Sequence, residues 1–279
     1  MGGEIQSLNS RSVSNIVGRG GTILGSSRSK DFATQRGLRD ALRHLNEAGL
    51  DGLVVVGGDG TMRGARALAD AGFPTVGIPG TIENDVWGTD YSVGLDTAMN
   101  TAMYALDRIK DTASSQEQAF LVEVMGEKSG YLALMVGIAG GAEMVCIPEV
   151  AYDLDDVSAE VADAYVRGKR HCIIVVAEGT KPNAGAIAEH LGQREDETGF
   201  RLRVSALGHI MRGGAPTARD RMLGTRLGAA AVEQLHEGNG GVMVGLDGNS
   251  VVPVPLADVT DNIRQIDEEY RTLARILSR

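Results

Sequence analysis

The chain has 279 residues, of which 43% are apolar and 23% are charged, a composition that argues against an intrinsically disordered protein. Its formal net charge of −10 and sequence pI near 5.0 repel polyanions, so nucleic acids and anionic membranes are disfavoured as main partners. A small anionic ligand remains compatible with this charge if a local basic pocket receives it.

The cysteine content and the first residues indicate the cellular compartment of the protein. Cys146 and Cys172 are too few for a disulfide framework, and each lies in an apolar run, so we expect buried thiols in a reducing compartment. The start, MGGEIQ, lacks the basic and apolar parts of a signal peptide, and no apolar run approaches the ~18 residues of a membrane span. We therefore expect a soluble, cytoplasmic protein.

Short apolar runs alternate along the chain with amphipathic helical patterns. The runs that predict buried strands are residues 53–57, 74–79, 120–125, 144–148, 172–177 and 242–246. The helical patterns cover residues 32–48, 61–71, 92–110, 129–139, 155–168, 184–198 and 217–237. This alternation predicts an α/β fold with mostly parallel sheets, whose ligands bind at the carboxyl ends of the strands.

A glycine-rich loop, GGDGT at residues 57–61, follows the first expected strand and opens a helical pattern. Glycines allow backbone N–H groups to approach phosphate oxygens, and a helix N-terminus favours anions. Asp59 in this loop could hold Mg²⁺. The alternative is a tight turn in which Asp59 only caps the helix.

The loop PGTIENDVWGTD at residues 79–90 follows the next expected strand and places Glu83 and Asp85 on either side of Asn84. Carboxylates beside flexible backbone indicate a bound cation, a general base or a solvated turn. Successive parallel strands end at one crevice. Asp59, Glu83 and Asp85 together could therefore supply Mg²⁺ ligands and a base for phosphoryl transfer.

Two later loops carry further candidates. In GHIMRGG, His209 and Arg212 precede two glycines and a helical pattern, so they could bind a phosphate monoester, although a lone histidine is more often structural. Arg203 adds a nearby positive charge. Glu178, in VVAEGT, could accept hydrogen bonds from sugar hydroxyls, or it could only cap the following turn.

Taken together, these motifs resemble the 6-phosphofructokinase family, in order and over nearly the whole chain. The resemblance rests on GGDGT, PGTIENDVWGTDYSVGLDTA, VEVMGEKSGYLAL, AGGAE, PEV, VAEGT and LGHIMRGG with DR behind it. It implies two three-layer α/β lobes assembled as an allosteric homotetramer. It also implies transfer of the γ-phosphoryl group of ATP to the 1-hydroxyl of fructose 6-phosphate, with Mg²⁺, in glycolysis.

The resemblance also implies a division into domains. Residues 1–95 would form the first part of the nucleotide-binding lobe, residues 96–215 the sugar-phosphate-binding lobe, and residues 216–279 a return that packs across both lobes. The family begins with a strand, a glycine-rich GGDxxGxN loop and a helix, which have no match before residue 20 here. We therefore expect the first lobe to be N-terminally incomplete and the sequence to be a fragment.

On the nucleotide side, Asp59 and Asp85 fall where the family holds Mg²⁺, and Arg28 falls on the arginine that contacts the transferring phosphoryl group. The residues at positions that line the triphosphate are Gly58, Gly60 and Thr61. Glu83 stands at the position of the catalytic base, with Thr81 at a sugar contact beside it. Glycines at positions 60 and 80 are typical of ATP users, because pyrophosphate users carry Asp and Lys there.

On the sugar side, the substrate-binding positions are Met125, Gly126, Glu178, His209 and Arg212. Arg203 falls on an arginine that the family supplies from the neighbouring subunit, so at least a dimer is expected. The resemblance also implies a nucleotide effector site, formed by Glu143, Arg167, Lys169 and Arg170. The alternative for these residues is an ordinary surface charge run.

Three positions depart from the family pattern. Glu83 replaces the Asp of TIDND, and a displacement of ~1 Å at a catalytic group can cost about a hundredfold in rate. Gln118 replaces a phosphate-binding arginine, and Glu127 replaces the arginine after MG. The alternatives are therefore a catalytically impaired paralogue or regulatory subunit, or a pyrophosphate-dependent variant. A third hypothesis, an NAD or lipid kinase, uses GGDGT alone and leaves the other motifs unexplained.

Overall fold

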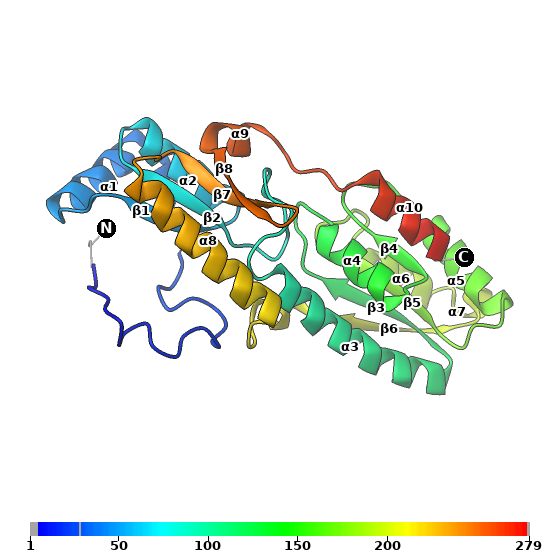
Figure 1. Cartoon of the computed structure of the whole chain (residues 1–279). Coiled ribbons are helices and arrows are strands. Elements are labelled where there is room, and N and C mark those ends of the chain that lie inside the picture. Colours follow the sequence, from blue (N-terminus) through cyan, green and yellow to red (C-terminus); the bar gives the residue numbers. More distant parts are fainter. Residues whose placement is uncertain (1–4, 28, 278–279) are drawn as a thin grey trace. The chain divides into compact units, whose positions relative to one another are not determined.

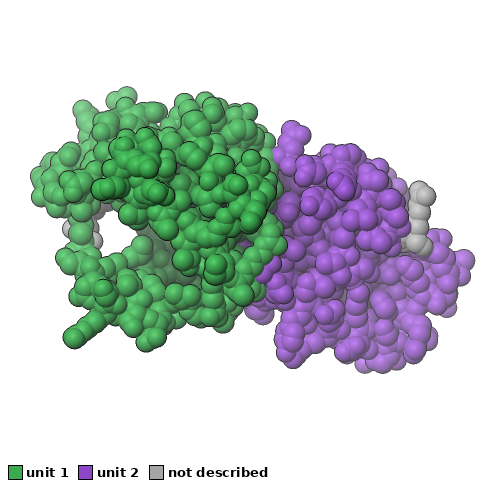
Figure 2. All heavy atoms as spheres, in the orientation of Figure 1, with its two compact units in different colours: residues 1–81, 85–94, 215–264 green, residues 82–84, 95–214, 265–279 purple. Residues whose placement is uncertain are grey.

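The computed structural model describes residues 5–27 and 29–277, and the chain divides into two compact units (Figure 2). Unit 1 contains residues 1–81, 85–94 and 215–264. Unit 2 contains residues 82–84, 95–214 and 265–279. The loop at residues 79–90 therefore contributes to both units, and so does the end of the chain.

Unit 1 is built on a four-stranded sheet with the order β1-β2-β7-β8 (Figure 1). Its strands are β1 (Leu53–Gly57), β2 (Thr75–Pro79), β7 (Val242–Asp247) and β8 (Ser250–Pro255). β1, β2 and β7 are parallel, whereas β8 returns antiparallel to β7. Gly248 lies in the turn between β7 and β8 at φ 57°, a conformation that glycine adopts without strain.

The helices described in unit 1 are α1 (Gln35–Glu47), α2 (Asp59–Asp70), α8 (Ala218–His236) and α9 (Leu256–Asp261). Residues 5–27 form turns without a helix or strand, and a 3-10 helix at Asp31–Ala33 precedes α1. The side chain of Thr34 accepts a hydrogen bond from Gly37 N–H and so caps α1. The core of this unit contains Met62, Ala65, Val86, Met243, Leu256 and Val259.

Unit 2 is built on a second four-stranded sheet, β4-β5-β3-β6, in which all neighbouring strands are parallel. Its strands are β3 (Gln118–Val124), β4 (Met144–Cys146), β5 (Cys172–Ala177) and β6 (Arg201–Ala206). β5 is buried along its whole length, as expected for a central strand covered on both faces. β4 and β6 are the edge strands.

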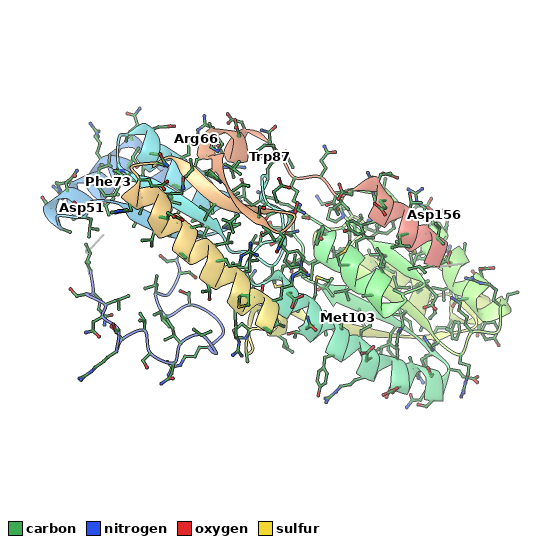
Figure 3. The ribbon with its side chains drawn as sticks, viewed as in Figure 1. Asp51, Arg66, Phe73, Trp87, Met103 and Asp156 are labelled. Carbon is green, nitrogen blue, oxygen red and sulfur yellow. The ribbon has the colours of Figure 1, made fainter. Side chains whose placement is uncertain are left out.

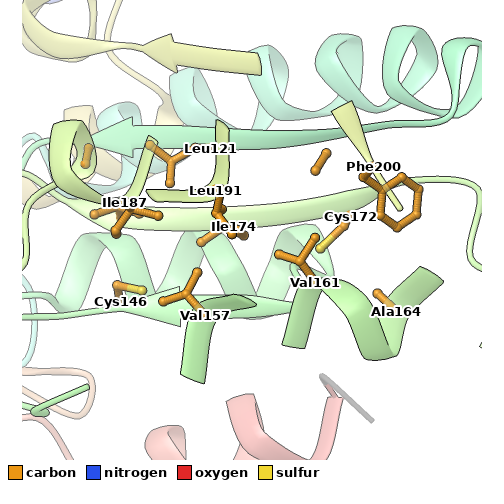
Figure 4. Packing of buried hydrophobic residues seen from close by; sticks show 13 residues of the cluster. Leu121, Cys146, Val157, Val161, Ala164, Cys172, Ile174, Ile187, Leu191 and Phe200 are labelled. Carbon is orange, nitrogen blue, oxygen red and sulfur yellow. The ribbon is translucent and has the colours of Figure 1, made fainter. Parts of the chain in front are cut away.

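The helices described in unit 2 are α3 (Leu95–Gln116), α4 (Tyr131–Gly140), α5 (Leu154–Val166), α6 (Ala184–Gly192), α7 (Glu195–Thr198) and α10 (Glu268–Leu277). Figure 4 shows how Leu121 and Ile174 of the sheet pack against Val157 of α5 and Ile187 of α6. A 3-10 helix follows β6 at Gly208–Arg212. None of the helices in the described ranges has the length and apolar character needed to cross a membrane.

Both cysteines are buried free thiols, as their apolar sequence context predicted. Cys146 and Cys172 belong to the same hydrophobic cluster of unit 2 (Figure 4). Burial raises the pKa of both thiols, that of Cys146 to about 12. Because the thiolate is the reactive form, both residues serve packing rather than chemistry.

The predicted α/β class with mostly parallel sheets is confirmed, and each expected strand corresponds to one of β1 to β5 or β7. The single helix expected over residues 184–198 is wrong, because Arg194 leaves the helical conformation at φ −125° and separates α6 from α7. β6 and β8 were not expected. β6 mixes arginines with apolar residues, and β8 contains Pro253 and Pro255, both of which weaken the sequence signal of a strand at a sheet edge.

Candidate active site

In unit 1, the loops that follow β1 and β2 leave the same edge of the sheet. Gly57 at the end of β1 pairs in register with Pro79 at the end of β2. Gly80 N–H then donates to Gly57 O at 2.9 Å, which ties the second loop to the first. Gly58 is the N-cap residue of α2, and Asp59 is the first residue of that helix. The two loops that the sequence predicted to share an edge are therefore neighbours.

Gly58 lies beneath the second loop. A Cβ at Gly58 would lie 3.4 Å from Thr81 Cβ and 3.9 Å from Asp85 Oδ1. The Asp85 carboxylate is therefore next to the residue that precedes Asp59 in the chain. This arrangement brings Asp59, Thr81 and Asp85 together around the N-terminus of α2.

Two glycines of GGDGT, Gly57 and Gly60, differ in the space around their α-carbons. A Cβ at Gly57 would lie 2.2 Å from Thr61 Oγ1, so this position excludes every larger residue. At Gly60, in contrast, a Cβ would meet no described heavy atom within 4 Å. The open space beside Gly60 lies at the first turn of α2, where unpaired backbone N–H groups and the helix dipole favour a phosphate group.

The carboxylates of Asp59 and Asp85 are the candidate metal ligands of unit 1. The side chain of Asp59 is 26% exposed, and its Oδ2 accepts a hydrogen bond from Arg63 at 2.7 Å. Among the described residues, no group of three or more His, Cys, Asp or Glu side chains could hold a metal by itself. Mg²⁺ is commonly bound by one or two carboxylates together with phosphate oxygens and water. This donor set therefore fits Mg²⁺ that arrives with a nucleotide.

Arg63 was missed by the sequence analysis. It follows Asp59 by four residues on the same helix, a spacing that places both side chains on one face and could have identified the pair. The ion pair fixes the orientation of the Asp59 carboxylate at the N-terminus of α2.

Glu83 is bonded within unit 2. Its Oε2 accepts a hydrogen bond from Glu127 N–H at 3.0 Å and a longer one from Lys128 N–H at 3.5 Å. The neighbouring Asn84 is 1% exposed and adopts φ 50°, a left-handed conformation that Asn tolerates better than most residues. This turn directs Glu83 to the loop that follows β3, while Asp85 lies beside Gly58.

In unit 2, three parallel strands end at one edge. Val124 at the end of β3 is in register with Ala177 at the end of β5, and Glu123 is in register with Ala206 at the end of β6. Glu178 N–H, directly after β5, donates to Val124 O at 3.0 Å. The segments after the three strands are therefore neighbours, as the parallel topology requires.

The candidate sugar-binding residues gather at this edge. Arg212 Nε lies 3.1 Å from Met125 Sδ, and the side chains of His209 and Arg212 are exposed. Gly179 N–H donates to Gly126 O at 3.0 Å, which links the loops after β3 and β5. Gly126 adopts φ 147°, in the region that favours glycine. The edge thus presents an accessible imidazole and an accessible guanidinium.

Arg203 lies apart from this cluster. It is in register with Phe120, three residues before Glu123, which corresponds to about 10 Å along the strand. Its side chain is exposed on the edge strand β6. Gln118 is 7% exposed at the opposite end of β3 from Met125. The phosphoryl-contacting candidate Arg28 lies outside the described residues.

Two of the four effector candidates contact each other. Glu143 is 5% exposed, and its two oxygens accept hydrogen bonds from Lys169 Nζ at 3.1 Å and from Ile173 N–H at 2.6 Å. Arg167 pairs with Asp163 on its own helix at 2.7 Å, and Arg170 is exposed. Glu143 thus connects β4 to β5 in this structure, which a surface charge run would not do.

Glu123 is a neighbour of the sugar-side residues that the sequence analysis missed. Burial, and secondly the nearby Glu178 carboxylate, raise the pKa of Glu123 above its ordinary value. A single carboxylate inside the apolar strand sequence FLVEVM was the available signal. The two carboxylates make this edge partly acidic despite Arg212.

The raised pKa makes Glu123 a source of instability at neutral pH. Ionised Glu123 costs folding free energy once the pH exceeds the pKa of the unfolded chain, because the folded state favours the protonated form. Glu123→Gln should therefore raise the free energy of unfolding at neutral pH and leave it unchanged at a pH below the ordinary carboxyl pKa. Urea denaturation at both pH values measures this, with Glu189→Gln on the exposed face of α6 as control. An equal gain at both pH values would contradict the prediction.

The sequence was compared with known proteins. A profile of the family described as Phosphofructokinase matches residues 1–235. The ATP-dependent 6-phosphofructokinase of Natranaerobius thermophilus is 48% identical over 276 residues, which are 99% of this chain and 85% of that protein. That of Brevibacillus brevis is 47% identical over 278 residues, or 100% of this chain and 86% of that protein.

Solved structures show the same fold. Phosphofructokinase from Pichia pastoris in the T-state is 31% identical with a TM-score of 0.84, and the match covers 97% of this chain. This chain spans only 31% of the length of that yeast chain. A pyrophosphate-dependent phosphofructokinase from Nitrosospira multiformis is 20% identical with a TM-score of 0.82 over 96% of this chain and 77% of its own, which shows the fold alone.

Proposed function

We infer that this chain, which belongs to the phosphofructokinase family, transfers the γ-phosphoryl group of ATP to the 1-hydroxyl of fructose 6-phosphate, giving fructose 1,6-bisphosphate and ADP. The observation that carries this inference is 47–48% identity to curated ATP-dependent 6-phosphofructokinases over 99–100% of the chain. The strand-end clusters of the two units are proposed to supply the side chains that such a reaction requires. The reaction is the phosphorylation of a sugar phosphate in glycolysis, and we assign it to the cytoplasm.

Unit 1 is proposed to bind the nucleotide. The N–H groups at the start of α2, with Gly58, Gly60 and Thr61, would receive phosphate oxygens, since a helix N-terminus and open glycines accept anions. Asp59 and Asp85 would hold Mg²⁺ together with those oxygens. The metal, when bound, neutralises negative charge on the phosphates. Arg28, at the family position for a contact to the transferring group, is proposed to add a second positive charge.

Glu83 is proposed to act as the general base. Its carboxylate takes the proton of the 1-hydroxyl, the oxygen forms a bond to the γ-phosphorus, and the bond from that phosphorus to the bridging oxygen of ADP breaks. The hydrogen bond from Glu127 N–H holds one carboxylate oxygen in place. This tether offsets the freedom that the extra methylene of Glu83 adds. Thr81 is proposed to orient the sugar beside the base.

Unit 2 is proposed to bind the sugar phosphate. His209 and Arg212 would clamp the 6-phosphate, because a guanidinium binds phosphate oxygens with two parallel donors. Met125, Gly126 and Glu178 would contact the sugar, with Glu178 accepting hydrogen bonds from hydroxyls. Arg203 is exposed on β6, away from these residues. In this position it would contribute to the substrate site of a neighbouring copy of the chain. A homotetramer, or a dimer at least, is therefore part of the proposal.

A nucleotide effector site is proposed at Glu143, Arg167, Lys169 and Arg170. The contact between Glu143 and Lys169 supports it, because the pair places a buried carboxylate beside a cation at the edge of β4 and β5. In the structure described, Arg167 is engaged with Glu160 and Asp163, so effector phosphates would have to compete for that guanidinium.

The choice of ATP over pyrophosphate should depend on Gly60. Gly60→Asp adds a carboxylate in open space at the first turn of α2, where an acidic residue is compatible with the helix dipole and the fold. The same charge repels the triphosphate, so the KM for ATP should rise by on the order of tenfold or more. Steady-state kinetics measure this change. Gly228→Asp, at an equally open glycine inside α8, is the matched control, and an unchanged KM in the Gly60 variant would refute the assignment.

The proposed activity is tested by assaying the purified full chain with fructose 6-phosphate, comparing ATP with pyrophosphate in the presence and absence of Mg²⁺. We expect fructose 1,6-bisphosphate with ATP and Mg²⁺ only. Product from pyrophosphate alone would identify the pyrophosphate-dependent variant. A folded protein that forms no product with either donor would support the catalytically impaired paralogue, which the replacements Glu83, Gln118 and Glu127 motivate.

A further inference from the structure

Unit 2 contains a cavity that the proposed reaction does not use. Its volume is about 540 Å³, which falls in the range of roughly 300–1,000 Å³ typical of small-molecule sites. It lies between α4, the edge strand β4, α5 and the C-terminal helix α10, all within unit 2. The carboxyl ends of β3, β5 and β6, where the sugar-side residues gather, do not line it.

The floor of this cavity is apolar. It is formed by Leu134 and Ile138 of α4 and by Val145 and Ile147 of the β4 segment. Helix α10, which covers the floor, has no buried residue, and Leu273, Ile276 and Leu277 on it are exposed. The helix is therefore held over the cavity by few apolar contacts, one of which is the edge-to-face contact of Tyr270 with Tyr131 of α4.

One wall of the cavity is acidic. Asp156, Glu160 and Asp163 all line it from α5, at a spacing of four and then three residues that places them on one face of the helix. Asp156 is labelled in Figure 3. Arg167 pairs with Glu160 at 3.3 Å and with Asp163 at 2.7 Å. This one guanidinium faces three carboxylates, so part of their charge is left for a ligand to balance.

Another part of the lining is basic. Arg271 and Arg275 line the cavity from α10, and Arg275 lies 3.6 Å from Glu268 of the same helix. Arg271 pairs with Glu268 through its terminal nitrogen at 2.5 Å, but its Nε–H is buried and has no hydrogen-bond acceptor among the described residues. A buried donor without an acceptor costs free energy, so a ligand oxygen would be favoured at this guanidinium once the side chain turns its Nε–H toward the cavity.

We propose that this cavity binds a small zwitterion with an apolar body, of the class of the apolar α-amino acids. The ligand carboxylate accepts from Arg271, the ammonium group faces the α5 carboxylates, and the apolar side chain lies on Leu134 and Ile138. A ligand with a single charge leaves one wall unbalanced, and a ligand without an apolar body leaves the floor in contact with water. This binding does not depend on the phosphoryl-transfer activity, because the cavity and the proposed active site share no residue; Glu143 of the proposed effector site does line the cavity.

The test is isothermal titration calorimetry of the full chain with L-leucine and L-phenylalanine, with two analogues of leucine that each lack one charge. These are 4-methylpentanoate, which has no ammonium group, and 3-methylbutylamine, which has no carboxylate. We expect saturable binding of at least one amino acid, with each analogue weaker by on the order of tenfold or more, the effect of losing one charge-assisted contact. No binding of either amino acid, or equal binding of an analogue, would overturn the proposal.

Variants locate the site. Arg271→Gln should weaken amino-acid binding by about tenfold while leaving the weak binding of 3-methylbutylamine unchanged. Arg43→Gln, which removes a guanidinium from a helical pair with Glu47 in unit 1, is the matched control and should bind normally. Ala274→Phe fills the cavity from α10 and should abolish binding while the thermal midpoint stays the same or rises. Amino-acid binding that persists in Ala274→Phe at full strength would place the ligand elsewhere and refute the site.

Discussion

Glu83→Gln should lower kcat by on the order of a hundredfold or more, because the amide cannot take the proton of the sugar hydroxyl. The amide oxygen can still accept the hydrogen bond from Glu127 N–H that holds Glu83 in the structure. The position of the loop at residues 79–90 should therefore be kept. The KM for fructose 6-phosphate should change little, since the substitution removes a step of the reaction rather than a binding contact. Steady-state kinetics and a thermal unfolding curve measure both properties.

Glu127→Gln is the matched control for this prediction. Glu127 is exposed, and it contributes its backbone N–H, not its side chain, to the contact with Glu83. Removing its charge should leave kcat unchanged, and it should if anything improve the affinity for the sugar phosphate. If Glu83→Gln retained full turnover while the control behaved as expected, another group would have to act as the base.

Asp59→Asn should produce the second large loss. A carboxylate that helps to hold the metal on the phosphates contributes to the neutralisation of charge in the transition state, so its replacement should lower kcat/KM by on the order of a hundredfold or more. Higher Mg²⁺ concentration should restore part of the activity, because the weakened site can be filled by mass action. The fold should survive, because the pair of Asp59 with the 61%-exposed Arg63 is a surface ion pair, which contributes little to stability.

Asp70→Asn on the same helix is the control that distinguishes the loss of a metal ligand from a general effect of removing a carboxylate from α2. Asp70 pairs with Arg66 at 3.5 Å across one helical turn, just as Asp59 pairs with Arg63, but it lies at the far end of the helix. Its replacement should alter neither activity nor Mg²⁺ dependence. Activity measured over a Mg²⁺ titration distinguishes the two variants, and an identical Mg²⁺ dependence in wild type and Asp59→Asn would remove Asp59 from the metal site.

The local geometry of the two candidate loops of unit 1 could be predicted from the sequence. GGDGT begins a helix at Asp59, and the loop after β2 lies against it through Gly80 and Asp85. These features can be predicted because the glycines, the preceding strand and the following helix lie within a few residues of one another in the sequence. The edge strands were harder to predict. β6 contains arginines and β8 contains prolines, and these segments form strands only because they pair with a neighbouring strand in the sheet.

The contacts of the candidate residues could not be predicted in the same way. Glu83 and Asp85 are separated by one residue, and the sequence treats them as a pair, yet Glu83 bonds to Glu127 N–H, 44 residues away. Arg203 and Arg212 are close in the sequence, but the register of β6 with β3 separates Arg203 from the strand end. Glu143 was predicted to belong to an effector site, with an ordinary surface charge as the alternative, and the pairing of β4 with β5 buries it against Ile173.

The sequence by itself determined the α/β class, the order of the strands and helices that alternate, and the loops that carry carboxylates, glycines and cations, because periodicity and turn chemistry are properties of neighbouring residues. Only the tertiary structure decided which of those loops meet, how Glu83 is tethered, and that α10 closes a charged cavity over β4. These outcomes depend on strand register and on packing between segments far apart in the chain. Burial at such contacts changes the free energy of a charged group more than the residues next to it in the sequence do.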